Sequence, residues 1–95
     1  MLIRSACFII LIVLIGFNNN IVYKSNVYHV QTEDGGPKNP KIVSLIYLKG
    51  VIVASKKTSY ADLMNEDNFE ETIKLLMEDQ HRNMIKDLLR GKFKK

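Results

Sequence analysis

The stretch Ile42-Val-Ser-Leu-Ile-Tyr-Leu-Lys-Gly-Val-Ile-Val-Ala-Ser-Lys56 contains two apolar runs separated by Lys49-Gly50. β-Branched and aromatic residues fill both runs, which is typical of strands. A glycine at the second position of a two-residue loop is typical of a type I′ turn, because both loop residues there need positive φ. The stretch therefore predicts a β-hairpin with strands over residues 42–48 and 51–56.

The hairpin predicts a register and two faces. A regular ladder pairs Leu48 with Val51, Tyr47 with Ile52, Ile46 with Val53 and Leu45 with Ala54. Because side chains alternate across a sheet, both faces become apolar, and a single helix covers only one of them. The two faces are Val43, Leu45, Tyr47, Ile52 and Ala54, and Ile42, Ile46, Leu48, Val51 and Val53. The alternation does not say which face the helix covers, and it leaves the other face as a candidate interface.

A third strand is predicted upstream of the hairpin. Residues 27–32 (VYHVQT) are rich in β-branched and aromatic side chains, and this strand starts between Ile21 and Val27. Residues 33–40 contain two glycines and two prolines, which predicts a loop. The three strands are expected to form an antiparallel meander with the strand that holds Tyr28 at its edge.

A long amphipathic helix is predicted after the strands. Asp67-x-x-Glu70 offers a capping box, Asn65 is a second N-cap candidate, and Gly91 follows the last turn. About 24 residues would span roughly 36 Å, which exceeds the roughly 20 Å of six-residue strands, so we expect the helix to overhang the sheet. A short helical turn is expected over residues 58–64. The apolar stripe recurs at spacings of three and four: Phe69, Ile73, Leu76, Met77, Met84, Ile85 and Leu88.

The expected fold is α+β, a three-stranded antiparallel β-meander packed against one long C-terminal amphipathic helix. An apolar N-terminal segment, residues 1–20, precedes the domain at 21–95. A chain of 95 residues excludes a second sizeable domain, and one cysteine excludes an internal disulfide. The small core that such a chain can build indicates that association contributes to its stability.

The apolar N-terminal segment allows three interpretations. Arg4 is followed by an uncharged run over residues 5–17, which matches the first two regions of a secretory signal. The run is shorter than the about 20 residues of a spanning helix, three asparagines follow it, and it has no Ala-x-Ala cleavage pattern. We expect an uncleaved signal anchor in the inner membrane. The alternatives are a cleaved signal, or a start codon assigned too early, which would make the protein cytoplasmic.

The charges are distributed unevenly along the chain. Residues 1–60 carry seven basic and two acidic side chains, and residues 61–95 carry seven basic and eight acidic ones. Acidic residues at the start and basic residues at the end of the predicted helix match the helix dipole, so the helix explains this order without a ligand. An alternative function is binding of single-stranded nucleic acid or another polyanion. It would use Lys38, Lys41, Lys56, Lys57 and the basic C-terminus (Arg90, Lys92, Lys94 and Lys95).

The residues offer one weak metal motif. Glu78-x-x-His81 has the spacing of the metal ligands in di-iron helical bundles, which need two such pairs and two further glutamates. One pair occurs here, so a metal-binding protein is a second alternative, and an exposed salt-bridging pair of Glu78 and His81 is the simpler interpretation. No serine or cysteine stands in a nucleophile motif, and we expect no enzyme activity, no catalytic residue, no metal and no cofactor.

Four stretches support a resemblance to a known group. They are Tyr28-His-Val-Gln-Thr-Glu-Asp-Gly-Gly36, Asn39-Pro-Lys-Ile42, Ser55-Lys-Lys-Thr-Ser-Tyr60 and Gln80-His81-x-x-Met84. Over about residues 27–93 the chain resembles a group of small uncharacterised bacterial proteins. The resemblance implies that the domain begins near Tyr28 and that the apolar segment is an addition. It transfers no activity and no catalytic residue.

The preferred function is a non-catalytic protein-interaction or self-association module, tethered to a membrane by residues 5–17. The expected partner is another protein or a second copy, which would meet the free sheet face or the Tyr28 edge strand. Three polar positions are candidate functional residues: His29, Gln80 and His81. Gln80 and His81 interrupt the apolar stripe, at a place where a side chain could reach the strand over residues 29–32.

Overall fold

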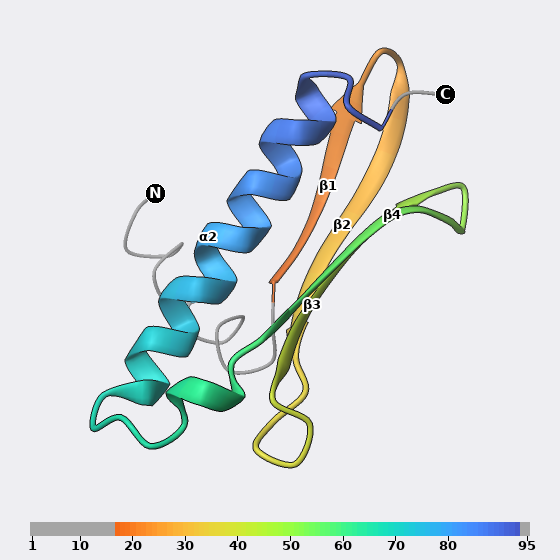
Figure 1. Cartoon of the computed structure of the whole chain (residues 1–95). Helices are drawn as coiled ribbons and strands as arrows, with labels where there is room; N and C mark the ends of the chain where they lie inside the picture. The colour runs from red at the N-terminus through yellow and green to blue at the C-terminus, as the bar shows by residue number, and fades with distance from the viewer. Residues whose placement is uncertain (1–16, 94–95) are drawn as a thin grey trace, which may run out of the picture.

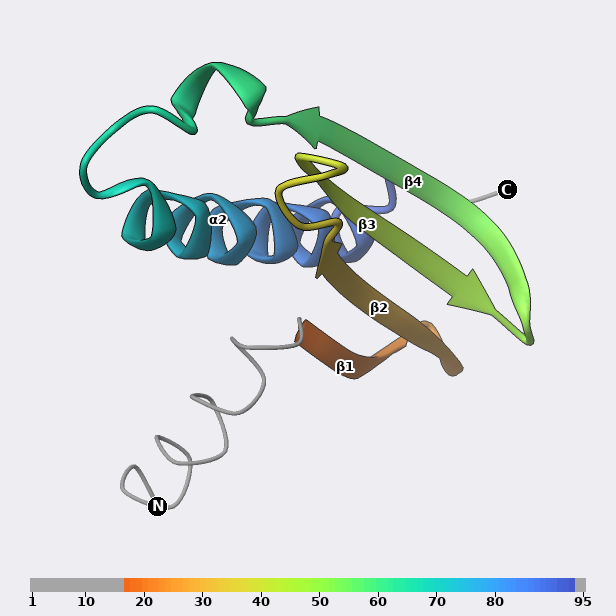
Figure 2. The same cartoon turned by 90° about the horizontal axis from the view of Figure 1, so that it is seen from below.

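The computed structural model describes residues 17–93 and is an α+β domain with two layers. One antiparallel sheet has the strand order β1-β2-β3-β4, and helix α2 lies across one of its faces (Figures 1 and 2). No helix in residues 17–93 has the length and apolar character needed to cross a membrane. The predictions for the apolar segment fall on residues 1–16, outside the described residues. The elements are β1 (Phe17–Tyr23), β2 (Asn26–Asp34), β3 (Lys41–Leu48), β4 (Val51–Ser59), the 3-10 helix η1 (Ala61–Leu63) and α2 (Phe69–Leu89).

The sheet has four strands, so the prediction of three is wrong. Strand β1 pairs with β2 along its whole length, and it begins four residues before the predicted domain boundary at Ile21. The connecting residues Lys24 and Ser25 both have positive φ, 50° and 69°, as a type I′ hairpin requires. Neither residue is typical of that turn, which is why the sequence pattern missed the strand. Because β1 lies outside β2, Tyr28 is on an interior strand and the predicted Tyr28 edge is wrong as well.

The predicted β3–β4 hairpin is confirmed at its tip and wrong further along. Lys49 and Gly50 have φ of 54° and 80°, and Leu48 pairs with Val51 and Tyr47 with Ile52. Beyond this point the register shifts by one residue. Ile46 therefore lies opposite Ala54 and Leu45 opposite Ser55, in place of the predicted Val53 and Ala54.

The register shift has a physical reason in the packing beneath the helix. It lets Val53 and Ala54 both pack against the core cluster under the end of α2. It also places Thr58 opposite Ile42 on the helix side of the sheet. A regular ladder would instead have directed Lys57 into the contact with α2, where burying its charge would cost free energy.

Helix α2 ends as the sequence predicts but begins differently. Gly91 has φ of 78°, and its N–H donates to the Leu88 carbonyl while the Lys92 N–H donates to the Asp87 carbonyl, each at 3.0 Å. This pair of hydrogen bonds is a Schellman motif. At the other end the N-cap residue is Asn68, without a side-chain cap hydrogen bond. The predicted caps at Asp67 and Asn65 are therefore wrong.

The predicted overhang of the helix is also wrong. The 21 residues of α2 span about 32 Å at 1.5 Å per residue. The strands have seven to nine residues, and nine residues extend over about 30 Å. The sequence pattern overestimated the length of the helix and underestimated the length of the strands. In the structure the helix and the longest strands have nearly the same length.

The core lies between α2 and the face of the sheet that holds Ile42 and Ile46, both with no exposed surface. It is divided into two apolar clusters along the helix. The first lies beneath the C-terminal half of α2 and the second beneath its N-terminal half. The first contains Tyr28, Val30, Ile46, Met84 and Leu88, and the second contains Ile42, Tyr60, Ile73 and Met77.

Candidate functional site

A layer of four buried polar side chains separates the two apolar clusters. Thr32 on β2 and Ser44 on β3 lie directly opposite each other, and neither has exposed surface. Gln80 and His81 lie above them on α2 and are 7% and 5% exposed. We call these four residues the polar layer. Alternation along the strands turns Thr32 and Ser44 inward beside Val30 and Ile42, so the layer follows from the register of the sheet.

His81 bonds through both ring nitrogens. Its Nε2 lies 2.7 Å from the Asn19 Oδ1, an oxygen that only accepts hydrogen bonds. Nε2 therefore carries the proton. Nδ1, 2.8 Å from the Thr32 Oγ1, accepts the threonine hydroxyl hydrogen. The prediction that a polar side chain in the helix stripe reaches the strand over residues 29–32 is confirmed at Thr32.

The hydrogen bonds continue across the layer in one direction. Because Thr32 donates to His81, its oxygen accepts from the Ser44 hydroxyl at 2.6 Å. Ser44 accepts in turn from the Gln80 Nε2 at 2.9 Å, and the Gln80 Oε1 accepts from the Thr58 hydroxyl at 2.5 Å. Within residues 17–93, no buried side-chain nitrogen or oxygen lacks a hydrogen-bond partner. The layer is thus fully satisfied, the condition under which buried polar groups help to specify one packing.

The environment of His81 favours its neutral form. Burial, followed by the charge of His29, lowers the pKa of His81 to about 4. The ring of Phe17 stacks on the imidazole with 5.3 Å between the ring centroids. A neutral ring with both nitrogens in hydrogen bonds holds α2 to β1 and β2. The Thr32 and Ser44 hydroxyls beside it are inaccessible to a substrate.

Glu78 and His81 are not brought together. The carboxylate of Glu78 lies on the exposed side of α2, 3.9 Å from the Arg82 guanidinium, whereas the His81 ring lies beneath the helix. Across residues 17–93, no group of three or more His, Cys, Asp or Glu side chains is placed to hold a metal ion. His81 therefore acts within the core, and its two ring nitrogens bind Asn19 and Thr32.

His29 lies on the other side of the sheet from the polar layer. Its Nδ1 is 2.9 Å from the Asn20 Oδ1 and its Nε2 is 3.0 Å from the Asn18 Oδ1. The Tyr47 ring lies beside it, with 6.1 Å between the centroids. The asparagines of β1 thus bond histidines on both faces: Asn18 and Asn20 on one, Asn19 on the other. No sequence motif marks this use of three consecutive amides.

The lysines proposed for polyanion binding divide between the two faces of the sheet. Lys56 lies opposite Ser44, and Lys57 lies opposite Val43, so neighbouring side chains on β4 point to opposite faces. Lys38 lies in the β2–β3 loop, outside the strands. Lys94 and Lys95 lie outside the described residues. Lys41 on β3 shares a face with Lys57, and Lys56 points to the other face, so the strand lysines are split two to one between the faces.

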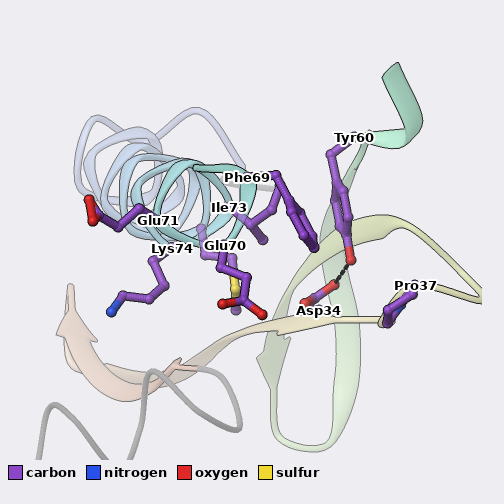
Figure 3. A pocket seen from close by; sticks show the side chains of 9 residues that line it. Asp34, Pro37, Tyr60, Phe69, Glu70, Glu71, Ile73 and Lys74 are labelled. Carbon is purple, nitrogen blue, oxygen red and sulfur yellow. Dashed lines mark hydrogen bonds between the residues drawn. The ribbon is translucent and has the colours of Figure 1, made fainter. Parts of the chain in front are cut away.

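A pocket of about 420 Å³ opens between α2 and the end of the sheet (Figure 3). On one side the Tyr60 hydroxyl donates to the Asp34 carboxylate at 2.5 Å. Burial and this hydrogen bond raise the pKa of Tyr60 to about 12, so the phenol remains protonated. Phe69, Glu70 and Lys74 line the other side from α2. No sequence pattern predicts this pair, because only the alignment of the ends of β2 and β4 brings these residues, 26 positions apart, together.

The face of the sheet opposite α2 is apolar along β3 from Val43 to Tyr47, with Lys41 at its start. We call it the open face, because no element among residues 17–93 packs on it (Figure 2). Val43, Leu45 and Tyr47 form its central column and are half-buried by their neighbours. Val22, Val27 and Ile52 on the flanking strands are 68%, 57% and 52% exposed. Comparisons of the chain with protein-family models, curated proteins and solved structures find no match.

Proposed function

We propose that the protein is a non-catalytic self-association module and that the open face is its contact surface. The main support for this proposal is the exposure of Val22, Val27 and Ile52 on one face of the sheet. They lie beside the half-buried column of Val43, Leu45 and Tyr47 on β3. Burying apolar surface stabilises an association by about 25 cal/mol per Å² before the entropic costs of binding. A second copy that covers β2, β3 and β4 would remove Val27 and Ile52 from water.

The size of the face sets the strength of the association that we expect. Four strands about 4.8 Å apart and about 27 Å long give a flat area of roughly 500 Å² per copy. Specific interfaces of standard size bury about 800 Å² per partner, and weak or transient ones bury less. The open face therefore fits a weak, reversible dimer rather than a permanent one.

The polar side chains support a non-catalytic function. Each nitrogen of His81 is engaged in a buried hydrogen bond, and the Thr32 and Ser44 hydroxyls have no exposed surface. A nucleophile or general base must reach the reacting atom of a substrate. The polar layer instead fixes how α2 sits on the sheet.

Sedimentation velocity of the full chain over a range of concentrations up to about 500 µM tests the proposal. The variant Val27→Ser/Ile52→Ser removes exposed apolar groups from the open face. The matched control Leu75→Ser/Leu89→Ser removes exposed apolar groups from the helix, where they are 64% and 50% exposed. We expect the first variant to weaken dimer formation and the control to leave it unchanged. A chain that stays monomeric at all concentrations, or two variants with equal effects, would contradict the proposal.

A further inference from the structure

We infer that the dimer is isologous, with a two-fold axis parallel to β3, and that Glu33 of each copy faces Lys57 of the other. This inference rests on the proposed function and adds the orientation of the partner. Rotation about such an axis stacks β3 on the β3 of the second copy. It also places β2 over β4 of the second copy and β4 over β2, and it leaves β1 with Val22 outside the overlap.

From Val43 to Tyr47 the open face matches itself under this rotation, and Lys41, at the exposed start of β3, would meet Lys41 of the second copy at the end of the column. Glu33 on β2 and Lys57 on β4 lie on either side of Val43, because both are its direct partners in the ladder. The rotation brings each carboxylate over an ammonium of the second copy at the rim of the contact. Opposite charges placed in this way favour the correct register and disfavour others.

The next two rows are also compatible with this rotation. Gln31 and Ser55 lie on either side of Leu45, so the rotation places Gln31 of each copy over Ser55 of the other, and both are uncharged. His29 and Ile52 lie on either side of Tyr47, and Ile52 also comes near Val27 of the second copy, one row further along β2. The central column of β3 packs on itself.

Other ways of pairing two copies fit less well. A two-fold axis across the strands at Leu45 would place Lys57 over Ile52 of the second copy, which would bury a charge against an apolar side chain. Pairing through the edge of β4 is disfavoured by its irregular register near Ala54 and by adjacent lysines, two devices that protect sheet edges. The axis along β3 is the arrangement that pairs the charges and the apolar side chains.

Charge reversal tests this geometry with a pattern that other arrangements do not produce. In Glu33→Lys both facing side chains become basic, and in Lys57→Glu both become acidic. Each variant alone should dimerise on the order of tenfold more weakly at low ionic strength. An equimolar mixture of the two should form a heterodimer with nearly the wild-type dissociation constant, because each basic side chain then faces an acidic one. The double variant Glu33→Lys/Lys57→Glu should recover as a homodimer.

Native mass spectrometry of the full chain, with one variant labelled with ¹⁵N, separates the heterodimer from both homodimers. Glu78→Lys, which reverses an exposed charge on α2, is the control and should dimerise like the wild type. Single variants that dimerise like the wild type, or a mixture that forms no excess heterodimer, would overturn the inferred axis and leave the proposed function in place. A wild-type chain that is monomeric at about 500 µM would instead refute the proposed function itself.

Discussion

Lowering the pH from 7 to 4 should destabilise the fold through one residue, His81. The pKa of His81 is about 4 in the folded protein, against the ordinary value of 6.5, and burial is the main cause. Between these two values the unfolded chain binds a proton that the folded protein does not bind. Stability must therefore fall as the pH decreases through this window, and the contribution of His81 is constant above about pH 7 and below about pH 4.

The size of this loss follows from the two pKa values. Each unit of difference corresponds to 1.36 kcal/mol, so the full window gives up to about 3 kcal/mol. The 77 described residues suggest a total stability of about 4 to 12 kcal/mol. Protonating one side chain should therefore remove a large share of the free energy of unfolding. The main structural cause is the burial of the ring, and the charge of His29 adds to it.

Urea unfolding of the full chain at intervals from pH 7 to 4 measures this loss, and the variant His81→Gln isolates it. Glutamine has hydrogen-bonding groups but no titration in this range, so the variant should lack the part of the pH dependence that belongs to His81. His29→Gln is the comparison on the open face and should retain the larger share of that part, which comes from burial, and lose the share that comes from the charge of His29. The titration of carboxylates is common to all three proteins and cancels in the comparison.

Parallel pH profiles for the wild type and His81→Gln would refute this reasoning. An NMR titration of the imidazole resonances gives a second measurement that needs no unfolding. The histidine that disappears in His81→Gln should titrate near pH 4 in the folded wild type. A value at or above 6.5 would show that the ring is not held neutral by the core.

Three further changes test other parts of the fold by urea unfolding. Gln80→Leu should lower the free energy of unfolding by about 2 to 3 kcal/mol, because it removes the donor to the buried Ser44 and the acceptor for the Thr58 hydroxyl. No loss of stability would mean that the polar layer contributes nothing. Gly91→Ala should cost about 1 to 2 kcal/mol, because its φ of 78° is unfavourable for a residue with a Cβ, and an unchanged midpoint would contradict the Schellman motif. Ile46→Ala should cost about 2 to 5 kcal/mol and Ile52→Ala less than about 1 kcal/mol, since the first has no exposed surface and the second is 52% exposed; equal costs would contradict the assignment of the two faces.

The parts of the fold that local residues determine could be predicted from the sequence. Lys49-Gly50 predicts the turn of the second hairpin, and Gly91 predicts the end of α2, because glycine has little steric cost at positive φ. The periodicity of the helix places its buried stripe. Gln80 and His81 interrupt that stripe, and from this break the contact with the strand of Thr32 was predictable.

The parts that depend on distant residues could not be predicted. Strand β1 carries three asparagines and a turn at Lys24-Ser25, so nothing local marks it. The side-chain amides of its three asparagines bind His29 on β2 and His81 on α2, which are distant in the sequence. The register shift near Ala54 turns Thr58 toward α2. There the Thr58 hydroxyl donates a hydrogen bond to the side chain of Gln80. The local strand propensity of β4 cannot predict the shift, because Gln80 lies 22 residues away from Thr58.

The most direct test of the central claim is a search for contacts between the open faces of two copies. A mixture of ¹³C-labelled and unlabelled full chains at about 500 µM allows isotope-filtered NOEs, which report only contacts between copies. We expect NOEs between methyl groups of Val43 and Leu45 of one copy and the same residues of the other. NOEs that arise from Leu75 and Leu89 on the outer side of α2, with none from β3, would contradict the claim that the open face joins two copies.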